Sequence, residues 1–149
     1  MLYLAADRPF ATGMIHYLDH VAISPHVPRL VVRVWLGNHH LEAVVDTGGV
    51  YFVCHPELIE WCIGEFGPEI GIETMNIRGY KVEGTLHRVR ITLEADRGQN
   101  LEVGATAFLP QLTPGQTWGL PSYLGLQGCL EFLRFAVDPG ENAFYFGAL

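Results

Sequence analysis

Short apolar segments separated by turn-forming residues dominate the chain, and this pattern predicts β-strands rather than long helices. Residues 30–36 consist largely of β-branched and aromatic side chains, which favour strands. Gly37 and Asn38 follow, and both tolerate the backbone angles of a tight turn. Residues 41–45 then return as a second apolar strand, which runs directly into Asp46.

The same criteria divide the rest of the chain into further strands and two short helices. Pro56 suits the first turn of a helix, where its missing N–H leaves no hydrogen bond unmade. Between residues 86 and 94 the two alternating sets of side chains differ in polarity, which predicts a strand with one wetter face. The expected elements are a helix over 55–62, a loop over 64–71, a hairpin over 74–84, strands over 86–94 and 101–108, a turn over 96–100, a loop over 113–121, a helix over 130–133 and a terminal hairpin over 136–146.

The chain divides into one main domain and an N-terminal extension. Its 149 residues fit a single domain of ordinary size. Residues 1–28 form the extension, in which prolines and glycine break any long element, and we predict one strand in it over 15–23. Residues 29–149 form the main domain, which we assign to the all-β class with one or two short helices.

Composition and charge narrow the possible functions. Apolar residues make up 49% of the chain and charged residues 17%, so a buried core is expected and disorder is not. The net charge is −7, and the nine Lys and Arg residues are scattered among sixteen Asp and Glu residues. Because nucleic acids and anionic lipids are bound by clustered cations, we expect no nucleic acid and no membrane as a partner.

Cysteine content and hydropathy favour a soluble, cytoplasmic protein. The three cysteines, Cys54, Cys62 and Cys129, are too few for a disulfide framework and suit a reducing compartment. The N-terminus lacks the basic start and the long apolar stretch of a secretion signal. No apolar run approaches the roughly 20 residues that span a bilayer.

The segment that carries chemistry is Asp46-Thr47-Gly48, directly after the apolar residues 41–45. A buried carboxylate is strongly unfavourable unless it is hydrogen-bonded or shares its charge with a partner. Gly48 lets backbone N–H groups approach the carboxylate, because no Cβ stands in the way. Taken alone, the triplet is equally compatible with a strand that ends in a turn, in which Asp46 bonds only its own backbone.

The order of the motifs resembles that of the retropepsin-like aspartic proteases, a family that includes the retroviral proteases. The resemblance extends from Arg29 to Phe146, which is most of the chain. Its parts are the strand pair that ends in Asp46-Thr47-Gly48, a glycine-bearing hairpin over 75–84 in the place of the family's flap, the apolar-apolar-Gly element Tyr123-Leu124-Gly125-Leu126 before a helix at 130–133, and a closing strand at 144–146.

This resemblance implies a closed or partly closed β-barrel of the acid-protease type that works as a homodimer. It implies an aspartic endopeptidase, in which the Asp46 carboxylates of two chains share one proton and activate the water that attacks a peptide bond. Because Asp-Thr-Gly occurs once in the chain, the second carboxylate must come from a second copy. Residues 1–28 are then a candidate interface strand, and no cofactor is implied.

The expected site residues follow from the same resemblance. Asp46, Thr47 and Gly48 are the expected catalytic residues, with Thr47 hydrogen-bonding across the pair of aspartates or serving as an ordinary turn hydroxyl. The hairpin tip either closes as a flap over an extended peptide or protein substrate, which would bind as an added strand, or is a plain surface hairpin. The expected substrate-binding residues are Gly49, Ile77, Arg78, Gly79, Tyr80, Leu124 and Gly125.

One position departs from the family pattern, because Gly49 stands where Ala or Ser is usual. A serine there would offer the carboxylate an additional hydrogen bond, which glycine cannot supply. The departure favours an alternative, in which a catalytically weak or inactive dimer of the same fold binds peptides or mediates assembly. A second alternative is a precursor in which residues 1–28 cover the cleft until they are removed.

Two other groups of residues do not have the spacing of a functional site. His39-His40, and Cys54-His55 with Cys62, lack the paired short gaps of structural zinc sites, so we predict no metal. Cys54 and His55 are neighbours along a predicted strand and point to opposite faces, which argues against a cysteine nucleophile. The chain also contains no phosphate-binding Gly-Lys-Ser/Thr loop and no Gly-x-Ser-x-Gly elbow.

Overall fold

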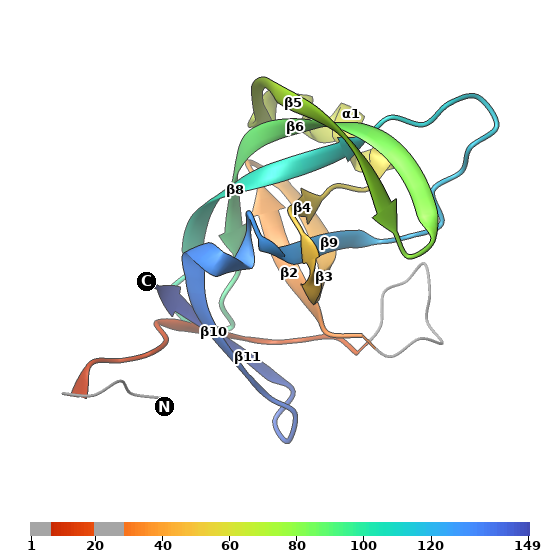
Figure 1. Ribbon diagram of the computed structural model, residues 1–149. Helices are drawn as coiled ribbons and strands as arrows, with labels where there is room; N and C mark the ends of the chain where they lie inside the picture. Colours follow the sequence, from red (N-terminus) through yellow and green to blue (C-terminus); the bar gives the residue numbers. More distant parts are fainter. Residues whose placement is uncertain (1–6, 20–28) are drawn as a thin grey trace.

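The computed structural model describes residues 7–19 and 29–149, and Figure 1 shows that they fold into curved strands with very little helix. The all-β class is therefore confirmed. The elements are β1 (Gly13–His16), β2 (Val31–Leu36), β3 (His39–Val50), β4 (Phe52–Val53), α1 (Pro56–Cys62), the 3-10 turn η2 (Ile63–Glu65), β5 (Phe66–Ile77), β6 (Tyr80–Leu93), β7 (Arg97–Gly98), β8 (Leu101–Pro110), β9 (Ser122–Gln127), the 3-10 turn η3 (Leu130–Phe132), β10 (Leu133–Asp138) and β11 (Ala143–Ala148).

Seven strands form one strongly curved sheet in the order β2-β3-β9-β4-β8-β6-β5 (Figure 1). Most neighbours are antiparallel, but β9 runs parallel to β3, and β4 runs parallel to β8. One further pairing joins β2 to β6, through Val34 with Leu93 and Trp35 with Thr92. The sheet therefore curls until two distant strands touch, although this contact is too short to close a complete barrel.

A second, four-stranded sheet has the order β10-β11-β1-β7 and lies below the large sheet in Figure 1. β10 and β11 are the predicted terminal hairpin. β1 pairs with β11 on one side and with β7 on the other, so both of its edges are bonded within its own chain. The strand predicted over 15–23 is shorter than expected, because β1 ends at His16, and its last residues from 20 onward lie outside the described ranges.

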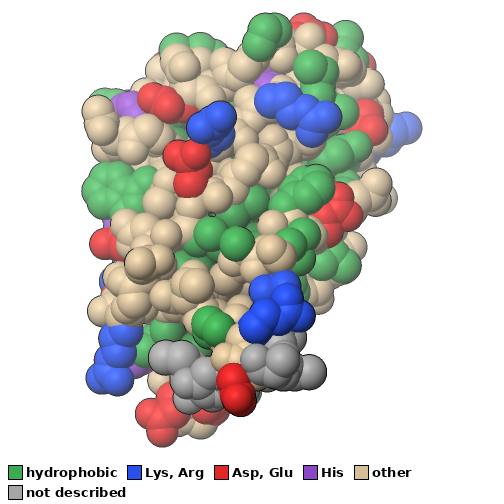
Figure 2. Space-filling view, turned by 90° about the vertical axis from the view of Figure 1, so that its left-hand side faces the viewer, with side chains coloured by type: hydrophobic (Ala, Val, Ile, Leu, Met, Phe, Trp, Pro, Cys, Tyr) green, Lys and Arg blue, Asp and Glu red, His purple; other side chains and the backbone are tan. Residues whose placement is uncertain are grey.

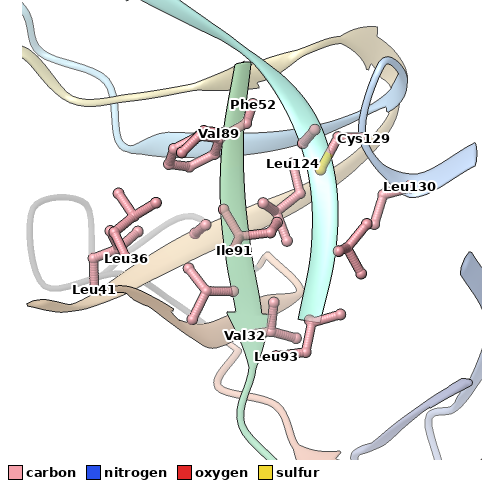
Figure 3. Close-up of a cluster of buried hydrophobic side chains, with 14 of the residues drawn as sticks. Val32, Leu36, Leu41, Phe52, Val89, Ile91, Leu93, Leu124, Cys129 and Leu130 are labelled. Carbon is pink, nitrogen blue, oxygen red and sulfur yellow. The ribbon is translucent and has the colours of Figure 1, made fainter. Parts of the chain in front are cut away.

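The main core lies inside the curl of the large sheet, as Figure 3 shows. Val32, Ile91 and Leu93 point into it from β2 and β6 and are almost completely buried. Ile15 and Phe144 add side chains from the small sheet, so both sheets share one core. The burial of alternate side chains along β6 confirms the strand with one wetter face that the sequence predicts.

The predicted strand pair over 30–45 is present, with the turn at Gly37-Asn38, and so is the helix that begins at Pro56. His55 caps this helix, because its ring nitrogen Nδ1 accepts a hydrogen bond from the backbone N–H of Glu57 at 3.2 Å. The strand pair and the helix were both predicted from a local signal, which was a turn-forming pair for the strands and a proline for the start of the helix.

Two predicted elements are wrong. Residues 64–71, expected to be a loop, contain η2 and the beginning of β5, which pairs with β6 from Phe66 onward. Irregular register between Phe66 and Gly71 lets this glycine-rich segment bend while it stays paired. Residues 130–133, expected to be a helix, form only the 3-10 turn η3, because Leu133 already pairs with Ala148 as the first residue of β10.

Charged side chains are distributed over the surface in small groups. On the face that Figure 2 shows, Lys and Arg side chains lie in separate places, with Asp and Glu side chains near them and hydrophobic side chains between. No helix among the described residues is long and apolar enough to cross a bilayer.

A charge network joins the small sheet to the large one. Asp96 accepts hydrogen bonds at Oδ2 from the backbone N–H of His16 at 2.7 Å and pairs with its ring Nδ1 at 3.1 Å, while Arg33 donates to Oδ1. Glu94 lies within 3.6 Å of Arg33 Nε and 3.1 Å of His40 Nε2. Burial opposes ionisation of Asp96, but the hydrogen bonds from His16 and Arg33 outweigh it and lower the pKa of Asp96.

Asp96→Asn is expected to reduce the free energy of unfolding by about 1 kcal/mol at neutral pH, because the ionised carboxylate accepts these hydrogen bonds. Since folding lowers the pKa of Asp96, this contribution is fully present above the usual aspartate value of 3.8 and is lost as the pH falls through the folded-state pKa. Urea unfolding of both proteins between neutral pH and about pH 3 measures the difference, which should narrow on acidification.

The matched control is Glu102→Gln, which removes the exposed ion pair with Arg90. Its difference from wild-type should stay near zero at every pH, because such surface pairs contribute little. A gap between wild-type and Asp96→Asn that does not change with pH would contradict the assigned role of the carboxylate.

Candidate active site

Asp46 lies where the regular pairing of β3 with β9 ends. In this parallel pair Asp46 stands opposite Gly125, and the register shifts before pairing resumes at Val50. The backbone N–H of Gly48 donates a hydrogen bond to Asp46 Oδ1 at 3.2 Å, and 25% of the side chain remains exposed. This local bond is the one that a simple turn also predicts, so the surroundings of the carboxylate must distinguish a functional site from a turn.

The position of β9 forces the loop after Asp46 into close contact with Gly125. β3 and β4 are consecutive along the chain, yet β9 lies between them in the sheet. Gly125 donates its N–H to the carbonyl of Tyr51 at 2.8 Å, and a Cβ on Gly125 would lie 2.5 Å from the Val50 carbonyl carbon. Only glycine therefore fits at this crossing.

Tyr51 fastens the same loop on its other side. Its φ of +64° is unusual for a non-glycine residue, and its N–H donates to the carbonyl of Gln127 at 2.6 Å. The hydroxyl donates to Glu73 Oε1 at 2.9 Å, which ties the loop to β5. Burial, helped by the hydrogen bond and the charge of Glu73, raises the pKa of Tyr51, so the hydroxyl keeps its proton at neutral pH.

The hairpin of β5 and β6 brings its tip to Asp46. Arg78 and Gly79 form the turn, with φ of +51° and +86°, and the N–H of Gly79 donates to Asn76 Oδ1 at 3.1 Å. Arg78 Nη2 lies 3.5 Å from Asp46 Oδ2, and the guanidinium carbon lies 5.8 Å from the centre of the Tyr123 ring. The hairpin predicted over 74–84 is thus present, and its tip contacts the carboxylate of Asp46 rather than solvent alone.

A cleft of about 440 Å³ lies between the loop and the hairpin tip. Its walls combine one carboxylate and one guanidinium with several apolar side chains and backbone of the glycine loop. The lining residues are Asp46, Gly48, Gly49, Val50, Val53, Met75, Asn76, Ile77, Arg78, Tyr123 and Gly125.

Six of the predicted site residues come together in this cleft: Asp46, Gly48, Gly49, Ile77, Arg78 and Gly125. Thr47 is exposed beside it. Gly79 forms the turn without lining the cleft, and Tyr80 is exposed and borders a separate hollow with Trp118. Leu124 is completely buried in the main core, so it supports the site from beneath and offers no surface to a ligand.

Sequence reasoning missed five lining residues: Val50, Val53, Met75, Asn76 and Tyr123. Tyr123 precedes the predicted Leu124-Gly125 by one residue, and alternation along β9 would have placed it on the opposite face from Leu124. The others depend on how β4 and the hairpin are placed around β9. No pattern within the sequence carries that information.

Other reactive groups among the described residues do not assemble into a second centre. No group of three or more His, Cys, Asp or Glu side chains in the described ranges has the arrangement of a metal site. Cys54, Cys62 and Cys129 are free and buried. Burial, with a smaller contribution from Cys62, raises the pKa of Cys54 to about 12, and burial raises the pKa of Cys129 to about 12. These thiols are therefore protonated and unreactive.

No family model and no curated protein matches the chain. The case for a function therefore depends on the geometry of the cleft: a partly exposed carboxylate, a backbone donor beside it, and a hairpin tip that reaches across.

Gly125→Ala is expected to destabilise the protein by about 1–3 kcal/mol, because the new methyl group would overlap the backbone of Val50 and Tyr51. Urea unfolding measures the loss. Gly104→Ala in β8 is the matched control, since a Cβ there meets no atom within 4 Å, and it should leave stability nearly unchanged. Equal stability of the two variants would show that the crossing of β9 past the loop is looser than the structure indicates.

Proposed function

We propose that the protein is an aspartic endopeptidase of the retropepsin type, in which two copies of the chain each contribute Asp46 to one active site. The observation that carries this proposal is the position of Asp46. Its carboxylate lies in a cleft, beside the Gly48 N–H and beneath a hairpin tip that can cover an extended peptide. A turn aspartate with only a local role would not require a hairpin from elsewhere in the sequence to reach it.

The chemistry needs two carboxylates close enough to share one proton. The ionised member accepts a proton from a water molecule held between them, and the protonated member donates a hydrogen bond to the carbonyl oxygen of the peptide bond. The water oxygen then attacks the carbonyl carbon, and no covalent intermediate with the protein forms. The Gly48 N–H supports this role because its hydrogen bond holds Asp46 Oδ1 in position beside the cleft.

The requirement for two carboxylates leads to the homodimer. Among the described residues that line the cleft, Asp46 is the only acidic one. Asp96 is held by His16 and Arg33 at the junction of the two sheets, and Asp138 accepts the Gly140 N–H in the terminal hairpin. A second Asp46, related by a twofold axis beside the exposed Thr47, supplies the missing group.

The walls of the cleft suit a peptide with apolar side chains. Val50, Val53, Met75 and Ile77 present apolar surface, and the backbone of the loop and hairpin offers groups that an extended chain could bond. A substrate bound in this way adds a strand, with alternate side chains entering the apolar parts of the cleft. The free, buried cysteines suit a reducing compartment, and we place the enzyme in the cytoplasm.

A peptide-binding module without catalysis is the second candidate, and two observations favour it. Arg78 already gives the Asp46 carboxylate an opposite charge within 3.5 Å, so a second aspartate is not needed to balance it. Gly49 fits closely around this arrangement, since a Cβ there would lie 3.1 Å from Asp46 Oδ2. The Ala or Ser that is usual at this position would require the carboxylate to shift slightly. Glycine allows the carboxylate to stay where the structure places it.

Asp46→Asn is expected to abolish cleavage of a diverse peptide library between about pH 3 and 8, because an amide cannot take part in the shared-proton chemistry. Mass spectrometry of the products measures the cuts, and Asp138→Asn serves as the matched control that should cut as wild-type does. Cuts retained by Asp46→Asn would exclude this active site. The absence of cuts by a wild-type dimer would favour the peptide-binding module.

Mixing the two proteins tests whether both Asp46 residues belong to one site. With Asp46→Asn in ninefold excess and subunits exchanging freely, only about one tenth of the wild-type chains meet another wild-type chain. The rate per wild-type chain should therefore fall to about one tenth, with peptide in excess over total protein so that substrate is not depleted. Native mass spectrometry confirms that mixed dimers form. An unchanged rate in their presence would show that each chain works alone.

A further inference from the structure

Arg78 introduces a positive charge into a cleft that is lined by both polar and apolar groups. Among the described residues that line the cleft, Arg78 is the only basic one and Asp46 the only acidic one. The side chain of Arg78 reaches Asp46 Oδ2 through Nη2 at 3.5 Å and lies over the ring of Tyr123. The hairpin thus carries a cation to the carboxylate on which the proposed chemistry depends.

The contact between Arg78 and Asp46 has the geometry of a loose ion pair. Its length of 3.5 Å exceeds the roughly 2.7–2.9 Å of a strong charge-assisted hydrogen bond. Half of the Arg78 side chain (53%) is exposed, so water competes with the carboxylate for the guanidinium. The pair therefore separates easily, and its strength does not explain why a charged residue occupies the hairpin tip.

In the proposed reaction Arg78 cannot remain on Asp46. The guanidinium lies at Asp46 Oδ2, whereas the two carboxylates need their oxygens to share a proton and hold a water molecule. The backbone keeps the residue close even after the ion pair separates, because the turn at Arg78 and Gly79 is fastened by the Gly79 N–H to Asn76. The released cation then stays at the cleft, half exposed to water, where it can contact a ligand.

Two side chains near the hairpin tip do not offer Arg78 a free carboxylate. Glu73, which lies on the strand that leads to the tip, accepts a hydrogen bond from the hydroxyl of Tyr51. Tyr123, the aromatic neighbour of Arg78, receives a hydrogen bond at its hydroxyl from Arg29 at 3.1 Å and offers no negative charge. A peptide that enters the cleft can bring a carboxylate to this position.

We propose that Arg78 is a specificity-determining residue, which binds an aspartate or glutamate side chain of the substrate next to the bond that is cleaved. In the empty cleft Arg78 rests on Asp46, and an acidic substrate takes the place of Asp46 as its partner. The planar guanidinium suits a carboxylate, to which it can donate two parallel hydrogen bonds. This inference rests on the proposed function, because it assumes that the bound peptide is cleaved. The binding of acidic peptides can nevertheless be tested without catalysis.

The first test compares pairs of peptides that differ only in Glu or Gln at each position near the bond. For wild-type, kcat/KM should be about threefold to tenfold higher for the Glu member at one position. In Arg78→Gln this Glu-to-Gln ratio should fall to about one, and Arg78→Lys should keep part of it, because lysine retains the charge without the planar fork. Lys81→Gln, a cation on the same hairpin outside the cleft, should keep the wild-type ratio.

The second test measures binding of the same labelled peptides to Asp46→Asn by fluorescence anisotropy. This variant does not cut and removes the carboxylate that competes for Arg78, so the Glu peptide should bind more tightly than the Gln peptide by at least the same factor. Adding Arg78→Gln to Asp46→Asn should abolish the difference. Circular dichroism of each variant verifies that it is folded.

The outcomes separate the two proposals. Cleavage by wild-type with no Glu preference in either test would overturn the role of Arg78 and leave the protease intact. No cleavage, together with charge-selective binding that Arg78→Gln removes, would overturn the protease and support Arg78 as the acidic-peptide contact of a binding module. Neither cleavage nor charge-selective binding would overturn both.

Discussion

The structure depends on the insertion of β9 between β3 and β4. Because these two strands follow each other along the chain, the loop that joins them has to pass over β9, and Gly125 is the point at which the two backbones meet. The contact is close enough that a single methyl group on Gly125 would overlap the loop. This crossing fixes Asp46 at the end of a regular pairing and leaves its carboxylate on the surface of a cleft instead of in the core.

The hairpin of β5 and β6 completes the cleft from a different part of the sequence. Its two long strands are paired along most of their length, and the Tyr51–Glu73 hydrogen bond connects them to the loop that carries Asp46. The loop and the hairpin are thus linked at two places, through this bond and through the loose Arg78–Asp46 pair. In the first link the donor is the Tyr51 hydroxyl, which is neutral and keeps its proton. The second link is a partly solvated ion pair, in which a ligand can take the place of one partner. The proposed preference for acidic peptides depends on this difference.

Sequence reasoning succeeded where a local signal decided the conformation. Gly37-Asn38 specified the turn between β2 and β3, Pro56 specified the start of α1, and alternation along β6 specified which side chains are buried. It failed at residues 64–71 and 130–133, where local preference and long-range pairing disagree. At 64–71 the glycines suggested a loop, but the segment pairs with β6 as a strand. At 130–133 the apolar residues suggested a helix, but Leu133 pairs with Ala148 as part of β10.

The sequence by itself determined the strand content and the carboxylate at the end of an apolar strand, because both depend on neighbours a few residues away. Tertiary structure alone decided that Tyr123, Val53 and Met75 share a cleft with Asp46, and that Arg78 points at the carboxylate. These residues come from four strands and a turn whose arrangement is set by β9 passing between β3 and β4. Such a crossing arises from packing between segments far apart in the chain, which no local pattern of side chains encodes.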